Sequence, residues 1–209
     1  MANNGFPVGN TIIGYRAADS NVAQNSTVIG FQAGRKNYIV SNTFIGALSG
    51  ENTTTGEVTA VGYSSANKNT TGNITAFGAY AGNNNTTGNS NTAIGSIALF
   101  NNTTGYQNTA IGSESLYSNT LGNNNTSTGY SSLYSNTAGE SNSAFGYATM
   151  NKNTSGSYNS AFGESTLLNN KTGNFNTAIG NSALRYDSIG SLNTATGVNS
   201  LYYLHHLNR

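Results

Sequence analysis

Acidic side chains are the most direct candidates for catalysis in this sequence, because glycoside hydrolysis and related reactions rely on paired carboxylates. The chain of 209 residues contains seven of them: Asp19, Glu51, Glu57, Glu114, Glu140, Glu164 and Asp187. No two recur at a spacing that would hold a pair of carboxylates together. The sequence therefore predicts no catalytic residue and a protein that is not an enzyme.

The remaining reactive groups point to no metal site and no cofactor. Without cysteine, the chain can form neither a disulfide nor a zinc–thiolate centre. His205 and His206 are adjacent but have no other ligand type nearby, so a solvated or capping role is favoured over metal binding. The glycines recur at regular intervals instead of preceding a helix, which argues against a phosphate-binding loop.

Aromatic rings are the other candidates for binding, since a tyrosine can stack on a sugar while its hydroxyl stays in water. They form two sets relative to a recurring glycine. The first set follows the glycine directly and the second lies five residues beyond it: Tyr15, Phe31, Tyr63, Tyr130 and Tyr147, then Phe100, Tyr117, Tyr134 and Tyr202. Packing at corners or between chains is favoured over glycan contact, and the ligand-binding residues stay unknown.

The composition narrows the classes of partner. Only 7% of residues are charged and the formal net charge is +1. The eight Lys and Arg residues are scattered along the chain and form no basic stripe, which predicts no nucleic-acid partner. No run is long and apolar enough to span a bilayer, so we expect no membrane insertion.

A short, strict repeat organises the whole chain. The segment NTAIG occurs at 91–95 and again at 108–112, and the glycine that closes it recurs four times after 16 residues and then seven times after 17. A period this short leaves no room for an ordinary helix and is typical of a solenoid. The corner glycines are Gly14, Gly30, Gly46, Gly62, Gly78, Gly95, Gly112, Gly129, Gly146, Gly163, Gly180 and Gly197.

The repeat predicts an all-β fold, a parallel β-solenoid or β-roll of about twelve coils of 16–17 residues. Residues 11–200 form the solenoid. We expect residues 1–10 to be an N-terminal cap and residues 201–209 to be a C-terminal cap or docking tail. At about 4.8 Å per coil, twelve coils would make a rod roughly 58 Å long.

The three residues before each glycine, T-A-I in most coils, predict a short strand. The last of them is mostly a large apolar residue, and we expect it to line the core. Because side chains alternate along a strand, a threonine column shares that face and a small, mostly alanine column takes the other. The predicted core column is Ile13, Ile29, Ile45, Val61, Phe77, Ile94, Ile111, Phe145, Phe162 and Ile179.

Two further columns follow the glycine. The position three residues on is always small, as at Ala98 and Ser115, which predicts close approach by the opposite wall of the coil or by another chain. The next position is Ala or Gly in the first five coils and then Leu or Met, as at Leu99. This switch coincides with the longer period, so we expect Leu to fill a wider interior.

A third column, seven residues past the glycine, is nearly all asparagine, as at Asn102 and Asn119. Stacked asparagines hydrogen-bond along a ladder of equivalent residues and tolerate turn conformations. We expect this column, and the second glycine that follows it at Gly105 and Gly122, to form a second corner.

The motifs NTAIG at 91–95, 108–112 and 176–180 and NSAFG at 142–146 and 159–163 resemble the head repeats of YadA-type trimeric autotransporter adhesins, and related repeats of bacteriophage tail fibres. The resemblance implies a left-handed parallel β-roll and a homotrimer packed through small-residue faces, for which the two Ala/Ser columns are the candidates. The coil is longer than in that family, and a neck, a heptad stalk and a membrane anchor are missing. A virus or phage fibre module or a secreted filament subunit is therefore favoured.

These observations predict a structural fibre or spike subunit that assembles through its sides or ends, as a homotrimer by preference or as a filament. The expected location is extracellular, on a virion or a cell surface, with a host-surface glycan or receptor as the further partner. The alternative is a ligand-binding solenoid, either lectin-like through its tyrosine rows or ice-binding through its threonine column. Ice binding favours two parallel threonine columns, whereas here threonine shares its face with an apolar column.

Overall fold

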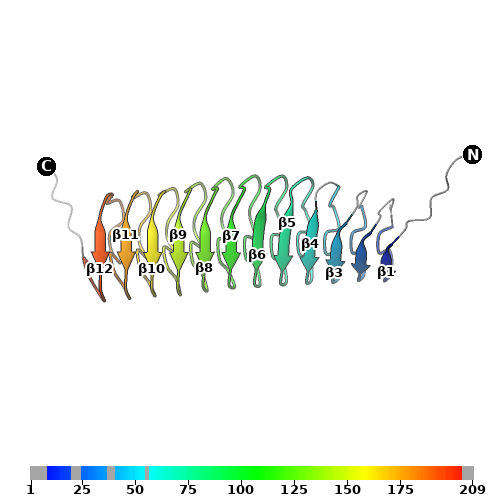
Figure 1. The fold of residues 1–209 in the computed structure, drawn as a ribbon, viewed down its shortest axis with the longest axis horizontal. Helices are drawn as coiled ribbons and strands as arrows, with labels where there is room; N and C mark the ends of the chain where they lie inside the picture. The colour runs from blue at the N-terminus through cyan, green and yellow to red at the C-terminus, as the bar shows by residue number, and fades with distance from the viewer. Residues whose placement is uncertain (1–8, 20–24, 37–40, 55–56, 204–209) are drawn as a thin grey trace, which may run out of the picture.

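The computed structural model describes residues 9–19, 25–36, 41–54 and 57–203, which form a rod of stacked coils (Figure 1). Each coil contributes one strand to a single parallel sheet, and the strand order along the sheet is the order along the chain. The predicted all-β parallel solenoid is confirmed. The strands are β1 Thr11–Ile13, β2 Thr27–Ile29, β3 Thr43–Ile45, β4 Val58–Val61, β5 Ile74–Phe77, β6 Asn91–Ile94, β7 Thr109–Ile111, β8 Thr126–Thr128, β9 Ser143–Phe145, β10 Ser160–Phe162, β11 Thr177–Ile179 and β12 Thr194–Thr196.

Equivalent residues of neighbouring coils lie directly above one another. In the pairing of β6 with β7, Ala93 lies opposite Ala110 and Ile94 opposite Ile111. The hydrogen bonds continue past the strand, where Gly112 N donates to Ile94 O at 2.7 Å. Each coil is thus bonded to the next around its perimeter, which is why the sequence period is kept so strictly.

The twelve corner glycines form the turns that the repeat predicts. Their φ angles lie between +118° and +137°, a region that side chains with a Cβ rarely adopt. The stack also leaves no space for a Cβ, since one built on Gly112 would lie 2.7 Å from Gly129 O. Two residues shortly after each corner glycine are also left-handed and are mostly not glycine, such as Glu114 at φ +63° and Leu116 at φ +51°. In most coils a third left-handed residue lies just before the strand, as Gln107 does at φ +55°.

The core column, however, is the middle residue of each strand, and the prediction that the last residue lines the core is wrong. The middle residues from Val28 to Ala178 are completely buried. A flattened coil holds little volume, so the small side chain turns inward and the large one is left outside. Of the predicted column, Ile29 and Val61 are half-buried and the others are 36–59% exposed: Ile13, Ile45, Phe77, Ile94, Ile111, Phe145, Phe162 and Ile179.

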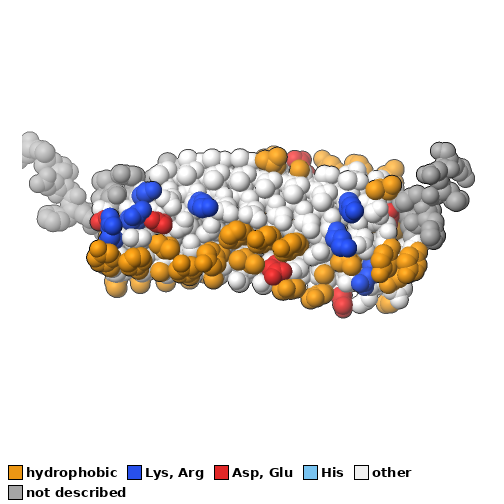
Figure 2. All heavy atoms as spheres, turned by 180° about the vertical axis from the view of Figure 1, so that it is seen from behind, with side chains coloured by type: hydrophobic (Ala, Val, Ile, Leu, Met, Phe, Trp, Pro, Cys, Tyr) orange, Lys and Arg blue, Asp and Glu red, His pale blue; other side chains and the backbone are white. Residues whose placement is uncertain are grey.

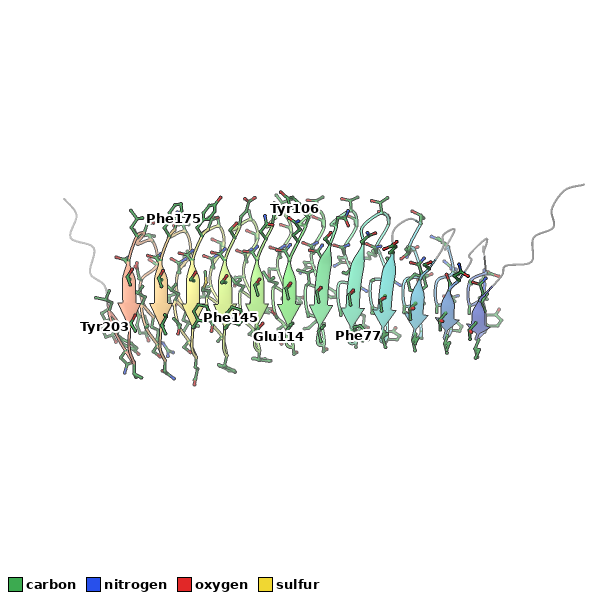
Figure 3. All side chains as sticks on the ribbon, in the orientation of Figure 1. Phe77, Tyr106, Glu114, Phe145, Phe175 and Tyr203 are labelled. Carbon is green, nitrogen blue, oxygen red and sulfur yellow. The ribbon has the colours of Figure 1, made fainter. Side chains whose placement is uncertain are left out.

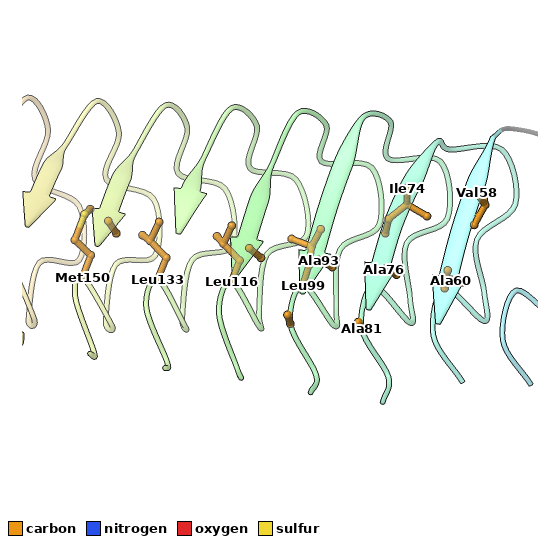
Figure 4. Packing of buried hydrophobic residues seen from close by; sticks show 14 of the residues in the cluster. Val58, Ala60, Ile74, Ala76, Ala81, Ala93, Leu99, Leu116, Leu133 and Met150 are labelled. Atoms are coloured by element: carbon orange, nitrogen blue, oxygen red, sulfur yellow. The ribbon is translucent and has the colours of Figure 1, made fainter. Parts of the chain in front are cut away.

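The interior accommodates about one large apolar side chain per coil (Figure 4). From the sixth coil onward it is the predicted leucine column, which is buried: Leu99, Leu116, Leu133, Met150, Leu167 and Leu184. In earlier coils the residue at that position is small, and a large side chain from the strand or its start fills the interior instead. A Cβ added to Gly34 would lie 2.7 Å from the ring of Phe44, so Phe44 occupies the space that a leucine fills later.

The small-residue column packs against the strand from the opposite wall of the same coil. Its members from Ala33 to Ala183 are completely buried, and Ser115 Oγ donates to Ser127 Oγ in the strand at 2.7 Å. Of the two predicted readings, close approach by the opposite wall is confirmed. The prediction that the Ala/Ser columns form the faces between chains is wrong, because both columns are enclosed within the coil.

The predicted caps fall mostly outside the described residues, since 1–8 and 204–209 are not described, and His205 and His206 lie there too. At the first described residues, Asn10 Oδ1 accepts a hydrogen bond from Ser26 N at 2.9 Å. Within the described part of the chain, no helix has the length and apolarity needed to cross a membrane.

Candidate functional surfaces

The buried asparagine side chains hydrogen-bond adjacent coils to one another. In the predicted column, Asn119 Nδ2 donates to Asn102 Oδ1 at 2.8 Å and to Gly122 O at 2.9 Å, which confirms the ladder and the second corner. Sequence reasoning missed a second ladder at the start of the strand. There Asn125 N donates to Asn108 Oδ1 at 3.0 Å. The recurring Asn of N-T-A-I-G was the available signal.

The surface carboxylates bind local partners. Five of them each form an ion pair or a hydrogen bond with a different residue of the same coil or of an adjacent coil. The pairs are Asp19 with Arg16 at 2.8 Å, Glu51 with Arg35 at 2.8 Å, Glu114 with Ser131 at 2.5 Å, Glu140 with Asn123 at 3.0 Å and Glu164 with Asn181 at 3.3 Å. Within the described residues, no three histidine or acidic side chains come together as candidate metal ligands.

The aromatic rings stack on their equivalents in the next coil. Tyr117 and Tyr134 have ring centres 4.9 Å apart and planes 6° from parallel, and Phe100 extends this row at 5.4 Å from Tyr117. Burial, with the nearby Tyr117 adding to it, raises the pKa of the Tyr134 phenol. Because the rings cover one another's faces, these rows are poorly arranged for stacking on sugars.

Other aromatic rings also stack on a ring in the next coil, at different edges of the rod. Phe145 stacks on Phe162 at the end of the strand, with ring centres 5.0 Å apart, and Tyr158 stacks on Phe175 at the same separation just before the strand. Figure 3 shows Phe77 and Phe145 at the edge of the rod where the strands end, and Tyr106 and Phe175 at the opposite edge. Both edges therefore carry exposed apolar surface.

The exposed apolar column is the first candidate interaction surface. We give this name to the large residues that end the strands, from Ile13 to Ile179, together with the exposed rings that directly follow the corner glycine, such as Tyr63 and Tyr147. Figure 2 shows hydrophobic side chains gathered in a band along one long edge of the rod. A contiguous apolar strip of this length is unusual on a monomer and typical of an interaction site.

The second candidate is a polar groove of about 450 Å³ on another side of the coil. Two rows of side chains line it, six and eight residues past the corner glycine: Lys68, Asn84, Asn101 and Ser118, then Thr86, Thr103 and Thr120. The rows are held by bonds along the rod, since Asn84 Nδ2 donates to Asn101 Oδ1 at 3.1 Å and Thr86 Oγ1 donates to Thr103 O at 2.8 Å. The lining is therefore ordered by the stack itself.

Comparison of the chain with protein-family models, with curated proteins and with solved structures gives no match.

Proposed function

We propose that this chain is a structural rod, a subunit of an extracellular fibre or spike on a virion or cell surface, and that it assembles side by side with copies of itself. The observation that carries this is the exposed apolar column, whose large side chains recur on the same face in every strand from β1 to β11 except β8, which ends in Thr128. An ordinary monomeric rod would place polar residues there.

The size of that surface suits self-association. Eleven coils at about 4.8 Å, with a strand of three residues at about 3.3 Å each, give a strand face of roughly 520 Å², which the exposed apolar column shares with the threonine row, before the flanking rings are counted. Stable interfaces bury about 800 Å² on each partner. A homotrimer, in which each rod contacts two others, remains the favoured assembly, with the exposed apolar column in place of the Ala/Ser columns as its contact.

The experiment is a measurement of molar mass by light scattering on the wild-type chain and on Ile111→Asp. Because Ile111 is 38% exposed in the rod, the aspartate should cost the single chain only about 1–2 kcal/mol, which leaves the coils folded. In the interface it places an unpaired charge, which should release monomers. Circular dichroism should stay that of the wild type.

The matched control is Gln107→Asp, which adds the same charge at an exposed residue just before the same strand. It should leave the assembly intact. A wild-type chain that is monomeric at all concentrations, or an Ile111→Asp variant that keeps the full molar mass, would contradict the proposal.

A further inference from the structure

The four lysines of the chain, although far apart in sequence, lie on one side of the rod. They are Lys36, Lys68, Lys152 and Lys171. The first three occupy the row six residues past the corner glycine, and Lys171 occupies the row of Thr154, two residues further on. These are the two rows that line the polar groove, and all four side chains are exposed.

Carboxylates are absent from these two rows within the described residues. Both ion pairs in the described part of the chain are made by arginines in other rows, Arg16 with Asp19 and Arg35 with Glu51. Figure 2 shows basic side chains spread over a wide face of mostly uncharged polar groups, with acidic side chains beside some of them near the N-terminal end. Within the described residues the two rows therefore form a strip with four lysines and no carboxylate, and Lys68 is the lysine that lines the groove itself.

The positive charges are widely spaced along the axis. Lys36 and Lys68 are two coils apart and Lys68 and Lys152 are five coils apart, or about 10 and 24 Å at roughly 4.8 Å per coil. Between them the lining offers amides and hydroxyls, such as Asn101, Thr103 and Ser118. This surface suits a long ligand that carries many hydroxyl groups and an anionic group at intervals.

We propose that this strip, with the groove at its centre, binds an acidic polysaccharide lying along the rod axis. Its carboxylate or sulfate groups pair with the lysine ammonium groups, and its hydroxyls hydrogen-bond to the asparagine, threonine and serine side chains between them. Because the stack already orders those side chains, little conformational entropy is lost on binding. The site deepens the proposed attachment role of the fibre by giving it a ligand class, and it shares no residue with the exposed apolar column.

Nucleic acid fits the same strip less well. A DNA duplex carries one charge per 1.7 Å, while four lysines are spread over eight coils, or about 38 Å. Proteins that bind single strands also present aromatic faces for the bases, whereas the rings of Phe100, Tyr117 and Tyr134 cover one another. The sparse charge thus favours a glycan.

The test uses the full chain and four immobilised probes: heparin, polygalacturonate, neutral dextran and a single-stranded oligo(dT). Heparin carries sulfates and carboxylates, and polygalacturonate carries carboxylates alone. One or both should bind, with affinity falling on the order of tenfold between 50 and 200 mM salt, and dextran should not. Lys68→Gln and Lys152→Gln should each weaken binding about fivefold, and Lys68→Arg should retain it.

The matched control is Arg16→Gln, which removes the same charge from a different row and should leave binding unchanged. Equal binding by the lysine variants, or no binding to either acidic glycan, would overturn the proposal. Lysine-dependent binding to oligo(dT) as tight as to the glycans would also overturn it in favour of a nucleic-acid site. Light scattering on the same variants separates these results from a failure of self-association, because the lysines lie outside the exposed apolar column.

Discussion

At the scale of single residues, two described positions of the asparagine column are not asparagine: Thr53 precedes the ladder and Asp187 ends it. Each ladder asparagine donates its Nδ2 to the Oδ1 of the coil before it, as Asn170 does to Asn153 at 2.8 Å. The next residue in the column is Asp187, which is buried and accepts from Gly190 N at 2.8 Å. Asn170 Oδ1 is a buried acceptor with no hydrogen-bond partner in the described part of the chain.

Replacing Asp187 with Asn should therefore stabilise the rod. The new Nδ2 supplies the donor that Asn170 Oδ1 lacks, and a buried charge is removed. The one oxygen that remains must serve both Gly190 N and Asn193 Nδ2, each of which has its own carboxylate oxygen in the wild type. The expected net gain is therefore less than about 1 kcal/mol in the free energy of unfolding, measured by chemical denaturation.

The control is the reverse change in mid-ladder, Asn119→Asp. It removes two donated hydrogen bonds and buries a carboxylate, so it should destabilise the rod by about 3 kcal/mol or more. If both variants moved the stability in the same direction, the ladder would not be the cause.

At the scale of elements, the corner is where two coils come closest. The same glycine conformation occurs at Gly112, which has a neighbouring corner stacked on it, and at Gly197, where a Cβ would have no atom of the described residues within 4 Å. The two positions separate the cost of backbone conformation from the cost of stacking.

Gly197→Ala should carry only the conformational strain, about 1–3 kcal/mol. Gly112→Ala should cost clearly more, because its Cβ meets the backbone of Gly129, which cannot move aside without separating the coils. Thermal unfolding followed by circular dichroism compares the two. Equal losses would show that stacking at the corner contributes nothing to stability.

The elements also show what the sequence can predict. The period, the strand positions, the corner glycines and the asparagine ladder all follow from spacing. Which side chains face the core does not follow from spacing. Side chains alternate along a strand, so either the middle residue or the two outer residues could face inward, and both patterns repeat equally well from coil to coil. The signal lies in volume: Phe44 is large where Gly50 is small, and Ala110 is small where Leu116 is large. That exchange identifies the alanine position as the one facing inward.

The surfaces were harder to predict than the fold. The lysines look scattered in the sequence because the two rows they share are visible only once the corner glycines are used as a register. The left-handed turn at Leu116 has a sequence signal only in the early coils, where Gly34, Gly50 and Gly82 occupy the same position. In the later coils stacking enforces a conformation that leucine alone disfavours.

At the scale of the whole molecule, each coil contacts only its neighbours, so coils are interchangeable units. Deleting residues 96–112, one full repeat from after one NTAIG to the end of the next, should leave a folded rod that is shorter by about 4.8 Å. Small-angle X-ray scattering measures the length, and circular dichroism reports the strand content.

A deletion of eight residues, 105–112, serves as the comparison because it joins coils out of register. It should lose cooperative folding. A full-repeat deletion that unfolds the chain as severely would mean that stability depends on contacts beyond adjacent coils.

The vertical stacking of equivalent residues also explains why so few of them are ionised. A charge repeated in every coil would repel its copy at about 4.8 Å by about 0.9 kcal/mol in water, and over eleven neighbouring pairs this sums to roughly 10 kcal/mol, as much as a typical protein's entire stability. Where ionised residues do share a row in successive coils, the sign alternates, as in Asp19, Arg35 and Glu51. Neutral polarity is thus a condition that in-register stacking imposes on the composition of the rod.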